Sequence, residues 1–235
     1  MIKIYVLGDD LDFPNPEYSI ISDGLVAIGG DLNPERILRA YSKGIFPWYS
    51  EGEPILWWSP DPRMILYFDD YKISRSLKKI LKKDKFKVKF DTNFEEVIKK
   101  CAEVRKEEGT WILPEVQEAY IHLHKLGYAH SVETYNEKGE LVGGLYGISI
   151  GGMFSGESMF TLENDASKVA LTYLVNVLKQ NYFDFIDCQI PSEHFARWGA
   201  IEIPRKMFLR ELKKSLKKKT VVGNWGEIFN VREGI

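Results

Sequence analysis

The chain has 235 residues, 44% of them hydrophobic and 28% charged, a composition typical of a soluble globular protein with one large or two small domains. Its longest apolar run, residues 141–156, is too short and too rich in glycine to span a membrane, which argues against a membrane protein. Two cysteines, Cys101 and Cys188, without a CxxC motif or a signal-peptide pattern, predict reduced thiols and a cytoplasmic location.

The net charge is only −2, but the charges are unevenly distributed along the chain. Residues 72–89 contain nine lysines or arginines and one acid, and residues 205–219 contain eight and one. Either segment alone could be a helix with a solvated lysine face. Together they favour contacts with the phosphate groups of a nucleic acid.

The first sixty residues are rich in proline, glycine and tryptophan, which leaves little room for long elements. Asn33 fits an N-cap and predicts a helix over residues 34–43. Trp48 stands in a loop between proline and polar residues, so it could offer a flat surface to a nucleobase. Trp57 and Trp58 are predicted to pack in the core, the usual place for tryptophan.

Apolar periodicity and capping residues define the middle of the chain. They predict helices at 74–83, from a capping box at Thr92–Glu95 to about 106, and at 114–126, with strands at 86–90 and 129–135. His122 and His124 lie two residues apart on the last helix and therefore face different sides. No metal site is expected from them.

The most apolar stretch, LVGGLYGISIGGMFSGESMF at residues 141–160, predicts two buried strands joined by a tight turn at Gly151-Gly152. Alternation places Ser155, Glu157 and Met159 on one face of the second strand. Glu157 is the only charged residue of the stretch, so it must be hydrated, paired or functional. The glycines around it favour a ligand-binding cleft over a salt-bridged core position.

The remaining elements alternate helix and strand. The sequence predicts a long helix capped by Asn164 or Asp165, a strand at 184–190, a short helix from Ser192 to Gly199, a strand at 200–203 and a lysine-rich helix opened by Pro204. After Lys219 it predicts no element.

Two polar residues on the 184–190 strand are candidates for chemistry. Asp187 and Gln189 share a face of an otherwise apolar strand and could orient an amine, although a structural role for Asp187 is supported equally well. Cys188 should be buried away from any cation, and Ser158 lacks the trailing glycine of a GxSxG motif. Neither is predicted to be a nucleophile.

The order of elements from residue 129 resembles the acyl-CoA N-acetyltransferase fold. It predicts an α+β protein: a small N-terminal α/β domain, then an acetyltransferase-like domain with a mixed, mostly antiparallel sheet flanked by helices. We expect residues 1–63 and 64–112 to form the N-terminal domain, as a Pro/Trp-rich segment and a basic remainder, and residues 113–235 the catalytic domain. TLENDAS, where CoA pyrophosphate would bind, has no glycine and two acids, so no cofactor is expected.

A more specific resemblance rests on motifs in a fixed order: FPNP, GLVAIGGDL, AYSKGIFPW, LWWSPDPR, ISRSL, TWI, AYIHLHKLGYAHSVE, LVGGLYG, GESMF, ASKVAL, IDCQ and EIPR. Across about residues 13–210 the chain resembles the leucyl/phenylalanyl-tRNA–protein transferase family. The resemblance implies transfer of Leu or Phe, and also Met, from aminoacyl-tRNA to proteins with N-terminal Arg or Lys, which marks them for degradation. It implies no CoA, no metal and no membrane.

The resemblance also assigns residues. Trp48 and Trp111 would hold the terminal adenosine of the tRNA, and Glu157, Asp187 and Gln189 would form the polar centre. The pocket for the aminoacyl side chain would consist of Leu145, Met159, Leu171, Leu174, Leu178 and Ile186. From the basic segment we expect tRNA phosphate contacts from Arg75, Lys78, Lys79, Lys82 and Lys83.

The expected reaction is aminolysis of an activated ester, which mainly requires a neutral amine to be placed on the carbonyl. Asp187, directly or through Gln189, could take the proton of the amine, or the terminal ribose hydroxyl could shuttle it. Glu157 could pair with the charge of the acceptor or with the ribose. Two alternatives are an acyl-CoA-dependent N-acetyltransferase and a non-catalytic RNA-binding module.

Overall fold

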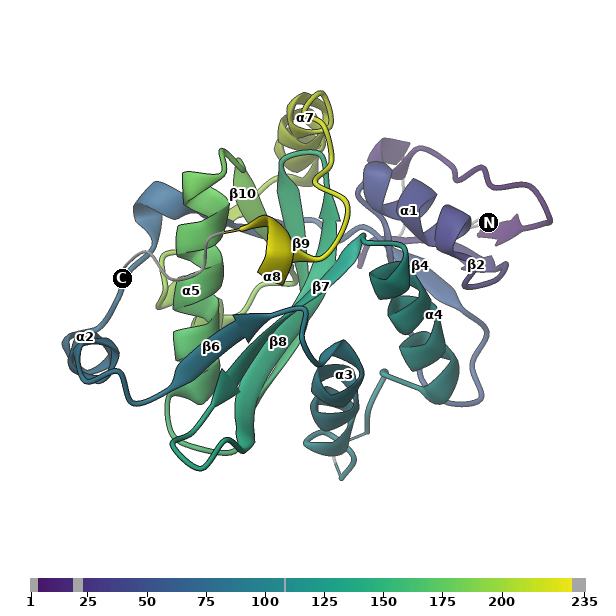
Figure 1. The fold of residues 1–235 in the computed structure, drawn as a ribbon. Helices are drawn as coiled ribbons and strands as arrows, with labels where there is room; N and C mark the ends of the chain where they lie inside the picture. The colour runs from purple at the N-terminus through teal and green to yellow at the C-terminus, as the bar shows by residue number, and fades with distance from the viewer. Residues whose placement is uncertain (1–3, 19–22, 108, 230–235) are drawn as a thin grey trace.

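The computed structural model describes residues 4–18, 23–107 and 109–229, which form two β-sheets with helices around them (Figure 1). The larger sheet has the order β11 (Ile201–Ile203), β5 (Arg63–Tyr67), β10 (Phe185–Gln189), β9 (Met153–Thr161), β8 (Leu141–Ile150), β7 (Ala129–Tyr135) and β6 (Lys87–Phe90). Within the described residues, β9 and β10 form its one parallel pair. The predicted α+β fold with a mixed, mostly antiparallel sheet flanked by helices is confirmed.

Helices cover both faces of this sheet. α3 (Phe94–Glu103) and α4 (Pro114–Lys125) lie on one face and α5 (Ala166–Gln180) on the other (Figure 1). α5 is held by a broad apolar face that includes Val169, Leu171, Leu174, Val175 and Leu178, all buried. α2 (Arg75–Lys82) packs against the outer side of α5 at the edge of the molecule.

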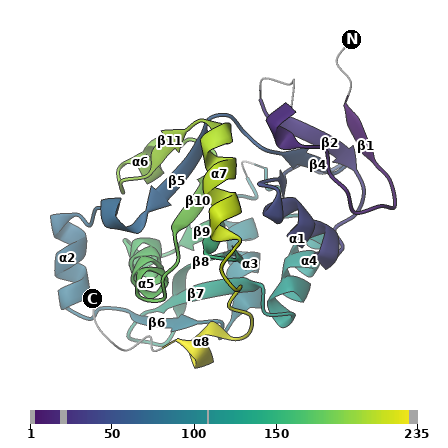
Figure 2. The same ribbon diagram turned by 90° about the horizontal axis from the view of Figure 1, so that it is seen from above.

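The smaller sheet has the order β1 (Tyr5–Leu7), β2 (Leu25–Gly29), β4 (Leu56–Trp58) and β3 (Phe46–Pro47). It lies at one end of the molecule with α1 (Pro34–Ser42), next to α4 (Figure 2). Asn33 caps α1 as predicted, since its side chain accepts a hydrogen bond from the backbone of Glu35. Trp57 is completely buried, and its indole donates to the Gly29 carbonyl at 2.9 Å.

Residues 64–112 contribute strands to the larger sheet. β5 pairs with β10 and β11, and β6 pairs with β7. The division of the chain at residues 63 and 112 stays a prediction.

Two predicted caps are wrong, for the same physical reason. The hydroxyl of Thr92 does not cap α3 but donates to the buried Glu133 at 2.8 Å, because a buried carboxylate needs donors. Asp165 occupies the N-cap position of α5 without a side-chain cap, and its carboxylate accepts from Lys168 at 2.6 Å. The α3 helix also ends at Glu103, short of the predicted residue 106.

The last part of the described chain holds elements of both kinds. They are the short helix α6 (Glu193–Ala196), the lysine-rich α7 (Arg205–Ser215) and α8 (Trp225–Ile228), together with two 3₁₀ turns earlier in the chain at Pro16–Tyr18 and Phe68–Asp70. Ser192 caps α6 as predicted. The sequence does not predict α8.

α8 is attached to the larger sheet through a buried polar cluster. Trp225 is fully buried and stacks on His130 with ring centroids 3.7 Å apart. One oxygen of Asp91 accepts from the Trp225 backbone and is hydrogen-bonded to His130, each at 2.8 Å. These contacts join residues far apart in the sequence, so no local pattern could announce them.

Candidate active site

A pocket of about 500 Å³ opens between the two sheets. Its walls come from β3 and the following loop, the segment between α3 and α4, strands β8, β9 and β10, helix α5, and residues 190–195. It is lined by Phe46, Pro47, Trp48, Arg105, Trp111, Leu145, Tyr146, Phe154, Gly156, Glu157, Ser158, Met159, Leu171, Leu174, Ile186, Cys188, Gln189, Ile190, Pro191, Ser192, His194 and Phe195.

Five of the six residues predicted for the aminoacyl side chain line this pocket. They are Leu145, Met159, Leu171, Leu174 and Ile186. The sixth, Leu178, lies one turn further along α5, is fully buried and is not among the lining residues. The apolar wall therefore comes from both the sheet and the helix that covers it.

Both tryptophans predicted to hold an adenosine also line the pocket. Trp48 is 43% exposed, which is unusual for so large a side chain. Its position is fixed by Trp58, whose ring meets it edge-on at 6.0 Å and whose indole donates to the Trp48 carbonyl at 2.6 Å. An exposed, immobilised aromatic face is suited to stacking.

Glu157 lies at a β-bulge. Gly147 of β8 pairs with Gly156, and Tyr146 pairs with Ser158, so Glu157 is an extra residue on β9. Because a bulge re-aims side chains, residues 156 to 159 all line the pocket, and the predicted strict alternation is wrong here.

Hydrogen bonds hold the Glu157 carboxylate in one orientation. One oxygen accepts from Gln189 at 2.9 Å and from Ser155 at 3.2 Å, and the other accepts from Tyr120 at 3.2 Å. The Tyr120 hydroxyl is 2.7 Å from that of Tyr41, on α1. Burial raises the pKa of Glu157 from 4.5 to about 7, although the hydrogen bond from Tyr41 opposes the shift.

Asp187 lies behind the pocket and not on its surface. It is completely buried and paired with Arg63, with Nε to Oδ1 at 2.8 Å and Nη2 to Oδ2 at 2.6 Å. The backbone N–H of Gln189 also donates to Asp187, at 2.9 Å. Both carboxylate oxygens are therefore occupied.

Gln189 connects the buried pair to the pocket. It has a left-handed backbone, with φ of 62°, at a register shift between β10 and β5. Its side-chain amide donates to Ser155 and Glu157. Among the hydrogen bonds of the described residues, none ends on its side-chain oxygen, which leaves that atom to accept from a ligand.

The sequence did not single out Arg63, although it lies in the LWWSPDPR motif. Its guanidinium lies between the rings of Phe46 and Phe208, 4.9 Å and 4.4 Å from their centroids. A lone arginine at the start of an apolar strand is a signal, because a buried guanidinium requires a carboxylate partner. The partner itself, 124 residues away, could not be identified from the sequence.

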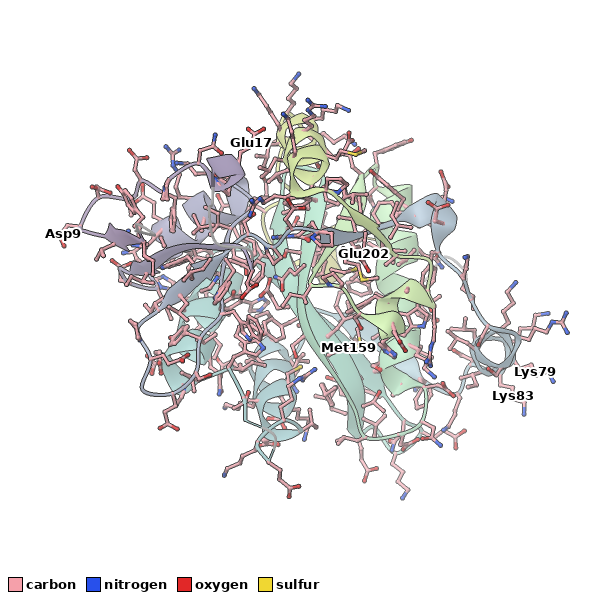
Figure 3. All side chains as sticks on the ribbon, turned by 180° about the vertical axis from the view of Figure 1, so that it is seen from behind. Asp9, Glu17, Lys79, Lys83, Met159 and Glu202 are labelled. Atoms are coloured by element: carbon pink, nitrogen blue, oxygen red, sulfur yellow. The ribbon has the colours of Figure 1, made fainter. Side chains whose placement is uncertain are left out.

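The predicted phosphate contacts lie elsewhere. The five basic side chains of the α2 region, Arg75, Lys78, Lys79, Lys82 and Lys83, are exposed and do not line the pocket. Figure 3 shows Lys79 and Lys83 pointing outward at the edge of the molecule, away from Met159.

Other predicted features can be placed as well. Cys101 and Cys188 are buried, and burial raises the pKa of both thiols. In the part of the chain that the structure describes, no three His, Cys, Asp or Glu side chains group as a metal site would require. No helix there is both long and apolar enough to cross a membrane.

Comparisons with known proteins agree on one family. A family model for leucyl/phenylalanyl-tRNA protein transferase matches residues 65–213, and a model for the N-terminal domain of these proteins matches residues 30–61. A leucyl/phenylalanyl-tRNA–protein transferase of Maridesulfovibrio salexigens is 53% identical over 224 residues, covering 94% of this chain and 93% of the relative. That of Thermodesulfovibrio yellowstonii is 55% identical over 228 residues, covering 96% and 92%.

Proposed function

The chain belongs to the leucyl/phenylalanyl-tRNA–protein transferase family and is an aminoacyltransferase, and we propose that the pocket between its two sheets is where the aminoacyl group changes carrier. One observation carries this proposal. A single pocket combines an apolar wall, an exposed tryptophan and a hydrogen-bonded carboxylate–amide pair.

The donor would occupy the pocket in two parts. Its side chain, from Leu, Phe or Met, lies against the apolar wall formed by Leu145, Leu171 and Ile186, where a charged side chain would lose its hydration without a partner. Its terminal adenosine stacks on Trp48 and Trp111. The tRNA body extends over the surface to α2, whose lysines contact phosphates.

The acceptor would be a protein whose first residue is Arg or Lys. Glu157 is the one carboxylate among the described lining residues, so it is the group available to a cationic acceptor. Products of this reaction would be marked for degradation by the new N-terminal residue. We infer a cytoplasmic location, where aminoacyl-tRNA is available.

In the reaction, the acceptor nitrogen attacks the ester carbonyl, a C–N bond forms and the C–O bond to the ribose breaks. The Gln189 side-chain oxygen accepts a hydrogen bond from the attacking amine and fixes its direction. Glu157, with its pKa of about 7, takes the amine proton and returns it to the leaving ribose oxygen. Asp187, held by Arg63, positions the backbone of Gln189 and does not contact the substrate.

A competition assay tests the function. The protein is incubated with leucyl-tRNA, acetyl-CoA and a peptide beginning with Arg, and the mass added to the peptide is measured. Addition of a leucyl group is expected. Addition of an acetyl group would favour the acyl-CoA alternative, and no addition would favour an RNA-binding module. A peptide with an acetylated N-terminus is the control and should remain unmodified.

A further inference from the structure

Arg105 is a pocket residue that the proposed reaction does not use. It follows the end of α3 and its guanidinium lines the pocket, on the same wall as Trp111 and Met159. One terminal nitrogen donates to the Cys101 carbonyl at 3.0 Å and to the Met159 carbonyl at 3.2 Å. The other donates to the Met159 carbonyl at 3.2 Å.

The charge of Arg105 is not neutralised by these contacts. In the part of the chain that the structure describes, no carboxylate oxygen lies within 4.0 Å of its guanidinium nitrogens. A guanidinium has five N–H donors, and two carbonyl oxygens use only some of them. An uncompensated, partly buried cation is unfavourable unless a ligand supplies the opposite charge.

The chemistry of the proposed donor identifies that ligand. At the terminal adenosine, the aminoacyl group, the base and the ribose are not anionic. The negative charge nearest to them is the phosphodiester that joins the adenosine to the preceding nucleotide. We propose that Arg105 binds this phosphodiester and so fixes the adenosine between the tryptophans and the reacting ester, an inference that rests on the proposed function. The planar guanidinium suits a phosphate because two parallel N–H donors can meet two oxygens.

The competing interpretation is that Arg105 only joins α3 to β9 through the two carbonyls. Both interpretations predict that replacing Arg105 lowers stability. They differ in one respect, since a purely structural arginine cannot distinguish two ligands that differ only in a phosphate.

The test therefore compares two probes. Both are leucyl-adenosine analogues with an amide in place of the ester, one with a free 5′-hydroxyl and one with a 5′-methyl phosphodiester. Isothermal titration measures their dissociation constants with the wild-type chain, Arg105→Gln and Arg105→Lys. A charged hydrogen-bond pair predicts that the wild type binds the phosphodiester about tenfold or more tightly.

In Arg105→Gln the ratio of the two constants should fall to about 1, and in Arg105→Lys it should be intermediate, because the charge remains but the fork is lost. Lys106→Gln, an exposed neighbour outside the pocket, is the matched control and should keep the wild-type ratio. Thermal unfolding of each variant confirms that the measured protein is folded.

The outcomes are separable. If the wild type binds neither probe, the proposed function of the pocket fails. If it binds both equally, or if Arg105→Gln keeps the wild-type ratio, the pocket assignment stands and the proposal for Arg105 is overturned.

Discussion

The inner wall of the pocket and helix α2 are both assigned to the same substrate, but they depend on opposite physics. The pocket wall is built on a buried Arg63–Asp187 pair and a raised carboxylate pKa at Glu157, where each group has fixed partners. The basic residues of α2 are exposed and hydrated. Burial amplifies electrostatic interactions while water and salt weaken them, so one substitution should disable the pocket, whereas α2 should respond only to several.

The largest effect is expected from Arg63→Met. Removing one partner leaves the Asp187 charge buried without compensation, which should cost about 3–5 kcal/mol of unfolding free energy. Urea denaturation at constant pH measures it. The matched control is Arg39→Met, which breaks an exposed Arg–Asp pair at 3.3 Å and should cost about 1 kcal/mol or less. Equal costs for the two variants would contradict the importance given to burial.

Next in size is the effect of Glu157→Gln on turnover. If Glu157 takes the proton, kcat should fall about 100-fold with little change in donor affinity. The wild-type rate should rise with pH through about 7, and the variant should lose that component. Glu202→Gln, an exposed acid on β11, should keep the wild-type profile. A variant that keeps near-normal turnover would instead favour a shuttle through the ribose hydroxyl.

The same carboxylate should also control stability. Because its pKa in the folded protein lies above 4.5, the folded state retains the proton that the unfolded state releases. The contribution of this group is therefore complete below about pH 4.5 and is lost as the pH rises through about 7. Glu157→Gln should remove this part of the pH dependence, measured by denaturation at several pH values.

A smaller effect is expected from Trp48→Ala. Loss of stacking should weaken binding of a terminal aminoacyl-adenosine mimic and of the full tRNA alike, by about 1–3 kcal/mol. Tyr182→Ala removes another aromatic side chain, 83% exposed, that does not line the pocket, and should change neither affinity. Weaker binding of the tRNA alone would place Trp48 outside the adenosine site.

The smallest effect is expected on α2. The double substitution Lys79→Gln/Lys83→Gln should weaken tRNA binding modestly, and the slope of log affinity against log salt should fall by about one unit for each phosphate no longer bound. The mimic should be unaffected. Lys206→Gln/Lys213→Gln, two exposed positions on α7, is the matched pair. If only the α7 pair changes the salt dependence, the tRNA body lies along α7 and the assignment to α2 is wrong.

The same contrast explains what the sequence could predict. Local patterns determine helices and hairpins, so the turn at Gly151-Gly152, the strands on either side of it and the start of α1 at Asn33 agree with the structure. The exposure of Trp48 could also be inferred from its loop context.

What failed depends on distant partners. The bulge at Glu157 arises from pairing between β8 and β9, and the diversion of Thr92 arises from the buried Glu133. Asp187 and Gln189 were rightly taken together, but the Arg63 contact that removes Asp187 from the pocket surface is set by the tertiary fold. A sequence pattern reports residue types and spacing, and it does not report which side chain reaches a group first.

The position of β5 within the larger sheet has a consequence for how the protein is made. This strand is synthesised early, yet both of its neighbours, β10 and β11, come late in the chain. At about 5–20 residues per second, the 124 residues between Arg63 and Asp187 take roughly 6–25 s to emerge. During that interval both edges of β5 lack their partners and the future active site has no buried ion pair. The nascent chain therefore presents an unpaired apolar strand to the ribosome exit region, a natural point for chaperone contact before the enzyme can close.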